Sequence, residues 1–119
     1  MEMQLTKTHL RYLLTIDELA QTAPGVSAGE VAKALAVSKP SVTRMIGLLM
    51  EKGLLNRERY GKVFLTDTGA HVAREYRERL RQLQGLIPRM GLELTEEELV
   101  DTAYLLAASL PDHAVCGIT

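Results

Sequence analysis

Between residues 38 and 65 the chain gathers mainly cationic, hydroxyl and aromatic side chains, which are the kinds that bind nucleic acid. The set consists of Lys39, Pro40, Ser41, Thr43, Arg44, Arg57, Arg59, Tyr60 and Lys62. An arginine side chain can donate two hydrogen bonds to the O6 and N7 atoms of guanine, whereas lysine and hydroxyl groups suit phosphate oxygens. This chemistry predicts contact with double-stranded DNA.

The distribution of charge along the chain also favours an anionic partner. The whole chain has a net charge of −1, but residues 38–84 carry ten Lys or Arg against five Asp or Glu. Residues 85–119 carry one base against six acids and are therefore acidic. A nucleic-acid contact needs a positive patch rather than a positive protein. For any single exposed cation, plain solvation is an equally good interpretation.

Other reactive residues suggest neither catalysis nor a complete metal site. The sequence has no glycine-rich phosphate loop and no nucleophile with a recognisable base, so an enzyme is not expected. His113 and Cys116 have a His-x-x-Cys spacing that could hold a transition metal. Structural zinc usually takes four ligands, so an ordinary C-terminal tail is the favoured interpretation of this pair.

The elements that must position the DNA-binding set are predicted from helix caps, because a Ser or Thr oxygen accepts a free backbone N–H of the first turn. Thr6 is expected to begin a first helix. Ser27 and Glu30 form a capping box before a short helix over residues 28–35, and Ser38 begins the next helix after a three-residue turn.

The helix that begins at Ser38 is expected to have two distinct faces. Its apolar stripe consists of Val42, Met45, Ile46 and Leu49. Burial of this stripe leaves Arg44 near the centre of the exposed face as the reader of bases, with Gly47 allowing close approach of the backbone. Lys39, Ser41 and Thr43 lie toward the positive end of the helix dipole and suit phosphates.

A hairpin is expected after this helix, which Gly53 would end in a left-handed conformation. Two short strands, residues 54–59 and 62–65, flank a predicted two-residue turn at Tyr60 and Gly61. The basic residues of this hairpin and Tyr60 would contact the DNA backbone or the minor groove. Such contacts supply affinity more than specificity, because each neutralised phosphate steepens the log–log salt dependence by about 0.9.

Two further helices are predicted toward the C-terminus. Thr66 or Asp67 caps a long helix that Pro88 stops or kinks. Thr95 and Glu98 form a second capping box, which opens a last helix.

These elements predict a mainly α fold, a winged helix-turn-helix with a small two-stranded wing followed by two C-terminal helices. Residues 1–66 would form the DNA-binding domain and residues 67–119 a helical dimerisation region. The sequence contains one cysteine, no signal-peptide pattern and no apolar run of membrane-spanning length. We therefore expect a cytoplasmic protein without membrane contact.

The segment from Val26 to Gly69 resembles the DNA-binding domain of the diphtheria-toxin-repressor family of iron- and manganese-responsive regulators. The resemblance is carried by SKPSVTRM and LTDTG, together with HLRYLLTIDEL in the first helix, and it covers about residues 5–90. It implies a homodimer assembled through the helices after the wing, with paired recognition helices on a palindromic operator. The residues expected in the dimer contact are Leu80, Leu83, Ile87, Leu99, Tyr104, Leu105 and Leu106. Packing of the last helix on its own domain is the alternative.

The resemblance also implies a divalent metal, such as manganese, iron or zinc, held by side chains of helices one, four and five. The matching positions of this sequence hold Arg11, Leu14, Leu80, Ala103, Leu106 and Ala107. None of these side chains serves as a metal ligand in proteins. We therefore expect the usual metal site to be absent and predict no cofactor; sensing of a metal through other ligands is an alternative.

The sequence thus favours a sequence-specific transcriptional regulator, more readily a repressor than an activator, that acts as a homodimer on DNA. A winged-helix module that contacts other proteins without specific DNA binding is the alternative, because this fold is also used without DNA.

Overall fold

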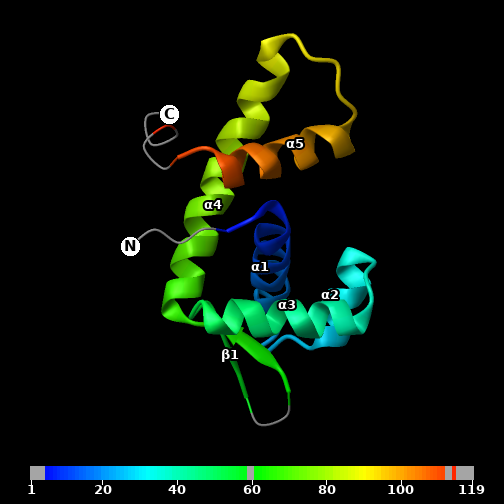
Figure 1. The fold of residues 1–119 in the computed structure, drawn as a ribbon, viewed down its shortest axis with the longest axis vertical. Coiled ribbons are helices and arrows are strands. Elements are labelled where there is room, and N and C mark those ends of the chain that lie inside the picture. Colours follow the sequence, from blue (N-terminus) through cyan, green and yellow to red (C-terminus); the bar gives the residue numbers. More distant parts are fainter. Residues whose placement is uncertain (1–4, 59–60, 112–113, 115–119) are drawn as a thin grey trace. The chain divides into compact units, whose positions relative to one another are not determined.

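The computed structural model describes residues 5–58, 61–111 and 114, which form helices and one two-stranded antiparallel sheet (Figure 1). In chain order the elements are α1 (Lys7–Ala20), α2 (Ala28–Leu35), α3 (Lys39–Glu51), β1 (Leu55–Arg57), β2 (Val63–Leu65), α4 (Asp67–Leu86), the 3₁₀ helix η1 (Ile87–Met90) and α5 (Glu96–Ser109). The chain divides into two compact units, one formed by Arg11–Arg74 and one by the residues on either side of that segment. The first unit thus extends past residue 66 to include the first turns of α4.

Helix α1 begins directly after Thr6, the cap expected from the sequence. Thr6 exchanges two hydrogen bonds with His9. The backbone N–H of His9 donates to Thr6 Oγ1 at 3.1 Å, and the backbone N–H of Thr6 donates to His9 Nδ1 at 3.1 Å. His9 therefore takes the place that Glu or Gln occupies in a capping box. This role gives His9 a structural function in the first turn.

The turn between α2 and α3 follows the predicted boundaries. Ser27 and Glu30 make the expected capping box of α2. Ala36 then adopts a left-handed conformation, with φ of 56°, which closes α2 although a Cβ disfavours that conformation. Ser38 caps α3, and Pro40 lies in the first turn, where its missing N–H removes no helical hydrogen bond.

The wing hairpin has a longer connection than the sequence pattern indicates. The backbone N–H of Glu58 donates to the Lys62 carbonyl at 2.8 Å, and that of Gly61 donates to the Glu58 carbonyl at 3.0 Å. Three residues, 59–61, therefore lie between this pair, so the prediction of a two-residue turn at positions 60 and 61 is wrong. Gly61 has a φ of 82°, which suits a three-residue hairpin connection that ends in a left-handed glycine.

The wing is anchored to the segment that precedes α2. Val26 and Val63 form an antiparallel bridge: the Val26 N–H donates to the Val63 carbonyl at 3.0 Å, and the Val63 N–H donates to the Val26 carbonyl at 2.8 Å. Val63 is fully buried and lies opposite Arg57 in the register of the hairpin. The sequence pattern did not predict this bridge, which ties the base of the wing to the helix-turn-helix.

The first turn of α4 is joined to the end of α3. Gly53 has a φ of 77° and follows α3 as expected. Thr66 Oγ1 donates to the Gly53 carbonyl at 2.6 Å and accepts the backbone N–H of Gly69 at 2.9 Å. Of the two candidate caps, Thr66 is therefore the one used, and its hydroxyl also fixes where α4 begins relative to α3.

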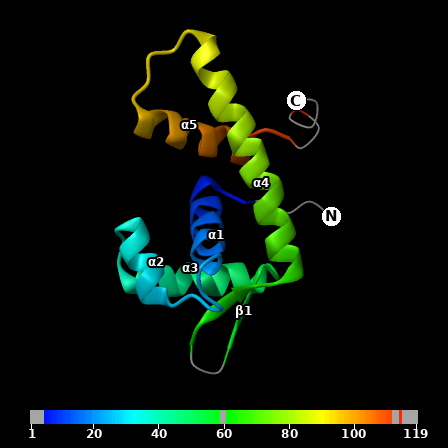
Figure 2. The same ribbon diagram turned by 180° about the vertical axis from the view of Figure 1, so that it is seen from behind.

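The core of the Arg11–Arg74 unit combines α1, the helix-turn-helix and the base of the wing (Figure 2). Its largest fully buried side chains are Leu13, Ile16, Val26, Val31, Val42, Ile46, Leu49, Leu54, Leu55 and Val63. Three members of the predicted α3 stripe are among them, and Met45 is half-buried. Burial of aliphatic side chains on this scale is the main stabilising term of such a unit.

In the second unit, α4 ends at Leu86 and Pro88 lies in η1, as the predicted stop requires. Thr95 and Glu98 form the expected capping box of α5. The buried side chains of this unit include Leu80, Leu83, Ile87, Ala103 and Ala107. Within the part of the chain that the structure describes, no helix is long and apolar enough to cross a membrane.

Candidate nucleic-acid interface

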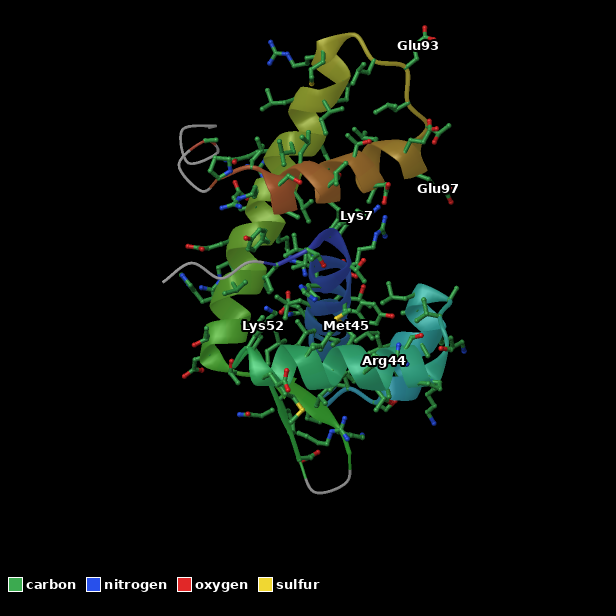
Figure 3. The ribbon with its side chains drawn as sticks, viewed as in Figure 1. Lys7, Arg44, Met45, Lys52, Glu93 and Glu97 are labelled. Atoms are coloured by element: carbon green, nitrogen blue, oxygen red, sulfur yellow. The ribbon has the colours of Figure 1, made fainter. Side chains whose placement is uncertain are left out.

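The buried stripe of α3 turns Arg44 toward solvent. The exposed residues of α3 are Lys39, Pro40, Thr43, Arg44, Gly47, Leu48, Met50 and Glu51. Arg44 and Met45 are labelled on this helix in Figure 3. An α-helix with its side chains is about 10–12 Å across, close to the roughly 12 Å width of the DNA major groove. The predicted recognition face is therefore open along the whole length of α3.

Gly47 leaves a gap in the middle of this exposed face. A Cβ added there would have no neighbour within 4 Å, so no packing inside the chain requires glycine. Glycine in a helix interior costs about 0.5–1 kcal/mol relative to alanine. The backbone of α3 is thus bare one turn after Arg44, where a large partner can approach closely.

Two of the predicted phosphate contacts are positioned by neighbouring residues. Ser38 Oγ donates to Ser41 Oγ at 2.8 Å, so the Ser41 hydroxyl keeps its own proton to donate to a phosphate oxygen. The Lys39 side chain extends over the start of α2, where its Cε would lie 3.8 Å from a Cβ added at Gly29. Both side chains lie at the N-terminal end of α3, which carries the positive end of the helix dipole.

The described cations of the wing are exposed, and the side-chain stem of one of them, Lys62, packs against Gly25. Arg57 and Lys62 are both exposed. A Cβ added at Gly25 would lie 3.1 Å from Lys62 Cβ and 3.2 Å from Lys62 Cδ, so the aliphatic stem of Lys62 covers this glycine. The ammonium group can then reach solvent while the stem packs. Arg59 and Tyr60 lie outside the described residues.

Two exposed residues on α3 and β1, Leu48 and Asn56, were given no role in the sequence interpretation. Leu48, one turn after Arg44, is 40% exposed, and an apolar side chain in that place can contact the methyl group of thymine. Asn56 is exposed on β1 next to Arg57, and its amide can donate to the DNA backbone. The exposure of Leu48 could have been predicted from the sequence, because this leucine lies outside the apolar stripe of α3.

The residues expected in a dimer contact divide into two groups. Leu80, Leu83 and Ile87 are buried within the single chain and leave almost no surface for a partner. Leu99, Tyr104 and Leu106 are half-buried, and Leu105 is 51% exposed. A contact between copies can therefore include residues of α5. It cannot include the apolar stripe of α4, because those side chains are already buried inside the chain.

Further apolar surface lies at the end of η1 and on the connection from η1 to α5. Met90 is 66% exposed, and Leu92 and Leu94 are also exposed. The sequence interpretation gave Met90 and Leu92 no role and placed Leu94 only as a hydrophobic contact at the start of the last helix, although large apolar side chains so close together in the chain are themselves a signal of a contact surface.

The residues present do not fit the metal that the resemblance implies. Within the described ranges no three His, Cys, Asp or Glu side chains group closely enough to hold an ion. Of the matching positions, Leu14, Leu80, Ala103 and Ala107 are buried hydrocarbon side chains. His113 and Cys116 lie outside the described residues.

A helix-turn-helix with an outward arginine, followed by a basic hairpin joined to the same core, defines a winged helix-turn-helix DNA-binding domain. Comparison with known families agrees with this class. Residues 4–63 match the model of the iron dependent repressor, N-terminal DNA binding domain, and the chain belongs to this family.

Solved structures of several regulators have the same fold. The manganese regulator SloR is 24% identical with a TM-score of 0.76, and the alignment covers 95% of this chain and 51% of that one. A manganese-dependent transcriptional repressor in complex with manganese is 29% identical with a TM-score of 0.70, over 92% of this chain and 50% of that one. A hypothetical protein from Sulfolobus solfataricus is 22% identical with a TM-score of 0.73, over 93% of this chain and 84% of that one. The chain thus spans about half the length of the two manganese regulators.

Proposed function

We propose that this chain is a sequence-specific transcriptional repressor that binds a palindromic operator as a homodimer in the cytoplasm. The observation that carries the proposal is the exposure of Arg44 at the centre of α3, opposite side chains that are fully buried. Membership of the iron-dependent repressor family supports DNA as the ligand. The affinity and the sequence specificity for DNA would then depend on the exposed side chains of α3 and the wing.

The proposed contacts have separate tasks. Arg44 would read guanine through its O6 and N7 atoms, and Leu48 would contact a thymine methyl group. Arg57 and Lys62 would bind phosphates beside the groove and set the orientation of the domain. Specificity and affinity should therefore respond to different substitutions.

The proposed homodimer explains how a small reading surface can specify an operator. One α3 reads only a few base pairs, whereas two copies related by a twofold axis read half-sites about 34–36 Å apart. The exposed apolar residues Met90, Leu92 and Leu105 offer a surface through which two copies can associate.

The proposal is tested by selecting duplexes from a random pool with the purified chain and measuring binding of the selected sequence. We expect an inverted repeat with guanine in each half-site. The selected duplex should bind more tightly than a shuffled duplex of the same composition at each of two salt concentrations. Equal binding of both duplexes would overturn the proposal. Transcription in vitro from a promoter that contains the selected site then tests repression, which predicts fewer transcripts.

A second candidate function is contact with another protein through the same face. Val37, Leu48 and Met50 are exposed apolar side chains on or beside α3, which a protein partner could cover. DNA binding would then be weak and without sequence preference, and loss of Leu48 would affect partner binding more than loss of Arg44.

A further inference from the structure

Helix α5 is tied to α1 by a side-chain cation. Lys7 Nζ lies 3.0 Å from Asp101 Oδ1 and 3.3 Å from Asp101 Oδ2, so one ammonium group contacts both carboxylate oxygens. Lys7 is in the first turn of α1 and Asp101 is in the middle of α5 (Figure 3 labels Lys7). These two helices are distant in sequence, and the ion pair joins them directly.

A second side-chain cation ties α5 to α4. Arg79 Nη1 donates to the backbone carbonyl of Ala107 at 3.3 Å. That carbonyl belongs to the last turn of α5, where carbonyl groups lack helical partners and the helix dipole is negative. The Arg79 guanidinium also lies over the ring of Tyr76, with 4.5 Å between Cζ and the ring centroid, which holds it in place on α4.

The same three helices carry the positions where the family resemblance implies metal ligands. In this chain those positions on α5 are taken by Ala103, Leu106 and Ala107, and the one on α4 by Leu80. Ala103, Ala107 and Leu80 are buried. Hydrocarbon side chains there favour direct helix packing and provide no lone pair for an ion.

We propose that Lys7 and Arg79 supply the positive charge that joins α5 to α1 and α4, and that operator binding by this chain does not require a divalent metal. The part concerning the operator rests on the function proposed above; the part concerning α5 does not. The positive charges are covalently attached to the chain, so the arrangement of the three helices is independent of metal supply. Among DNA regulators this predicts a protein whose DNA affinity does not follow metal concentration.

The first experiment measures fluorescence anisotropy of the full chain with its selected duplex in excess EDTA and then with manganese, iron(II) or zinc. An effector that controls binding typically changes affinity by roughly 5–150-fold. We expect the dissociation constant to stay within about twofold across all of these conditions, well below that range. A tightening of fivefold or more with any of the three metals would overturn the proposal.

The second experiment measures amide hydrogen exchange of α5 in the full chain. Lys7→Met and Arg79→Met keep most of the side-chain length and remove the charge. Each should speed exchange in α5 by roughly two- to fivefold, the effect of losing a partly exposed charged contact. Combining Lys7→Met with Asp101→Asn should give less than the sum of the two single changes, because the two side chains contact each other.

Arg81→Met is the matched control. Arg81 pairs with Glu78 within α4, so its loss should leave exchange in α5 unchanged. The hydrogen bond from Arg81 also lowers the pKa of Glu78. Unchanged exchange in α5 after both Lys7→Met and Arg79→Met would overturn the proposal.

The two experiments also separate this inference from the proposed function. Absence of any preferred duplex would contradict the proposed function, whereas α5 exchange in EDTA and in metal would still test the helix arrangement. Protection of α5 that rises strongly only when metal is added would contradict the inference, whatever the chain does with DNA.

Discussion

Gly69 in the first turn of α4 lies so close to Leu54 that a Cβ added to the glycine would overlap the Leu54 carbonyl oxygen. The same carbonyl accepts the backbone N–H of Thr66 at 3.0 Å, so it cannot move away without breaking that hydrogen bond. The contact joins the end of α3 to the start of α4. It explains the need for glycine at the end of the LTDTG segment.

Gly69→Ala should therefore destabilise the fold. We expect a loss of about 1–3 kcal/mol or more, because the obstacle is backbone and cannot rotate aside. Urea unfolding followed by circular dichroism measures the free energy. Gly85→Ala in the same helix is the control, since a Cβ there meets nothing within 4 Å. Equal stability of the two variants would show that α4 does not approach Leu54 this closely.

Gly47→Ala should separate stability from DNA binding. The substitution fills open space on α3 and should stabilise the fold by about 0.5–1 kcal/mol. If the bare backbone allows close approach of DNA, operator affinity should fall at the same time. Gly85→Ala should bring a similar gain in stability with unchanged affinity. A Gly47→Ala variant that binds the selected duplex as tightly as the parent chain would exclude a close approach at this residue.

Arg44→Ala and Lys62→Ala should affect binding in different ways. Loss of Arg44 removes a bidentate contact to guanine and should reduce discrimination between matched and mismatched duplexes by about 1–3 kcal/mol. Loss of Lys62 should weaken all duplexes alike and reduce the log–log salt slope by about 0.9. Anisotropy titrations at several salt concentrations measure both quantities. The assignment of roles fails if Arg44→Ala keeps full discrimination.

Leu105→Glu should weaken self-association. Leu105 is 51% exposed on α5, so a charge there should leave the fold intact but oppose apolar contact between copies. Sedimentation velocity measures the proportion of dimer. Leu48→Glu, a change of the same kind at an exposed leucine of α3, should leave self-association unchanged. If both variants associate like the parent chain, the dimer contact does not use α5 near Leu105.

Helix boundaries could be predicted because the forces that set them act between near neighbours in the chain. The capping boxes at Ser27 and Thr95 each depend on a side chain and a backbone group three residues apart. The stripe of α3 likewise follows from helical periodicity, which places its members on one face. The exposure of Arg44 then follows from the burial of the residues opposite.

The sequence could predict that the wing is a hairpin, but not which residues of its two strands pair. A glycine between two short segments that can form strands predicts a hairpin whichever residues pair. The hydrogen bond from Glu58 to the Lys62 carbonyl selects a three-residue connection. The bridge between Val26 and Val63 supports that pairing, and it joins segments far apart in sequence.

The sequence by itself determined the helices, the caps of α2, α3 and α5, the outward face of α3 and the basic character of residues 38–84, because these depend on local hydrogen bonds, periodicity and charge. Only the tertiary structure decided which apolar stripe remains available to a partner. Leu80, Leu83 and Ile87 have the same periodicity as a dimer seam, yet they are buried within one chain. Periodicity shows that a helix face must be covered, whereas contacts distant in sequence decide what covers it. The ties from Lys7 to Asp101 and from Arg79 to Ala107 depend on such contacts as well.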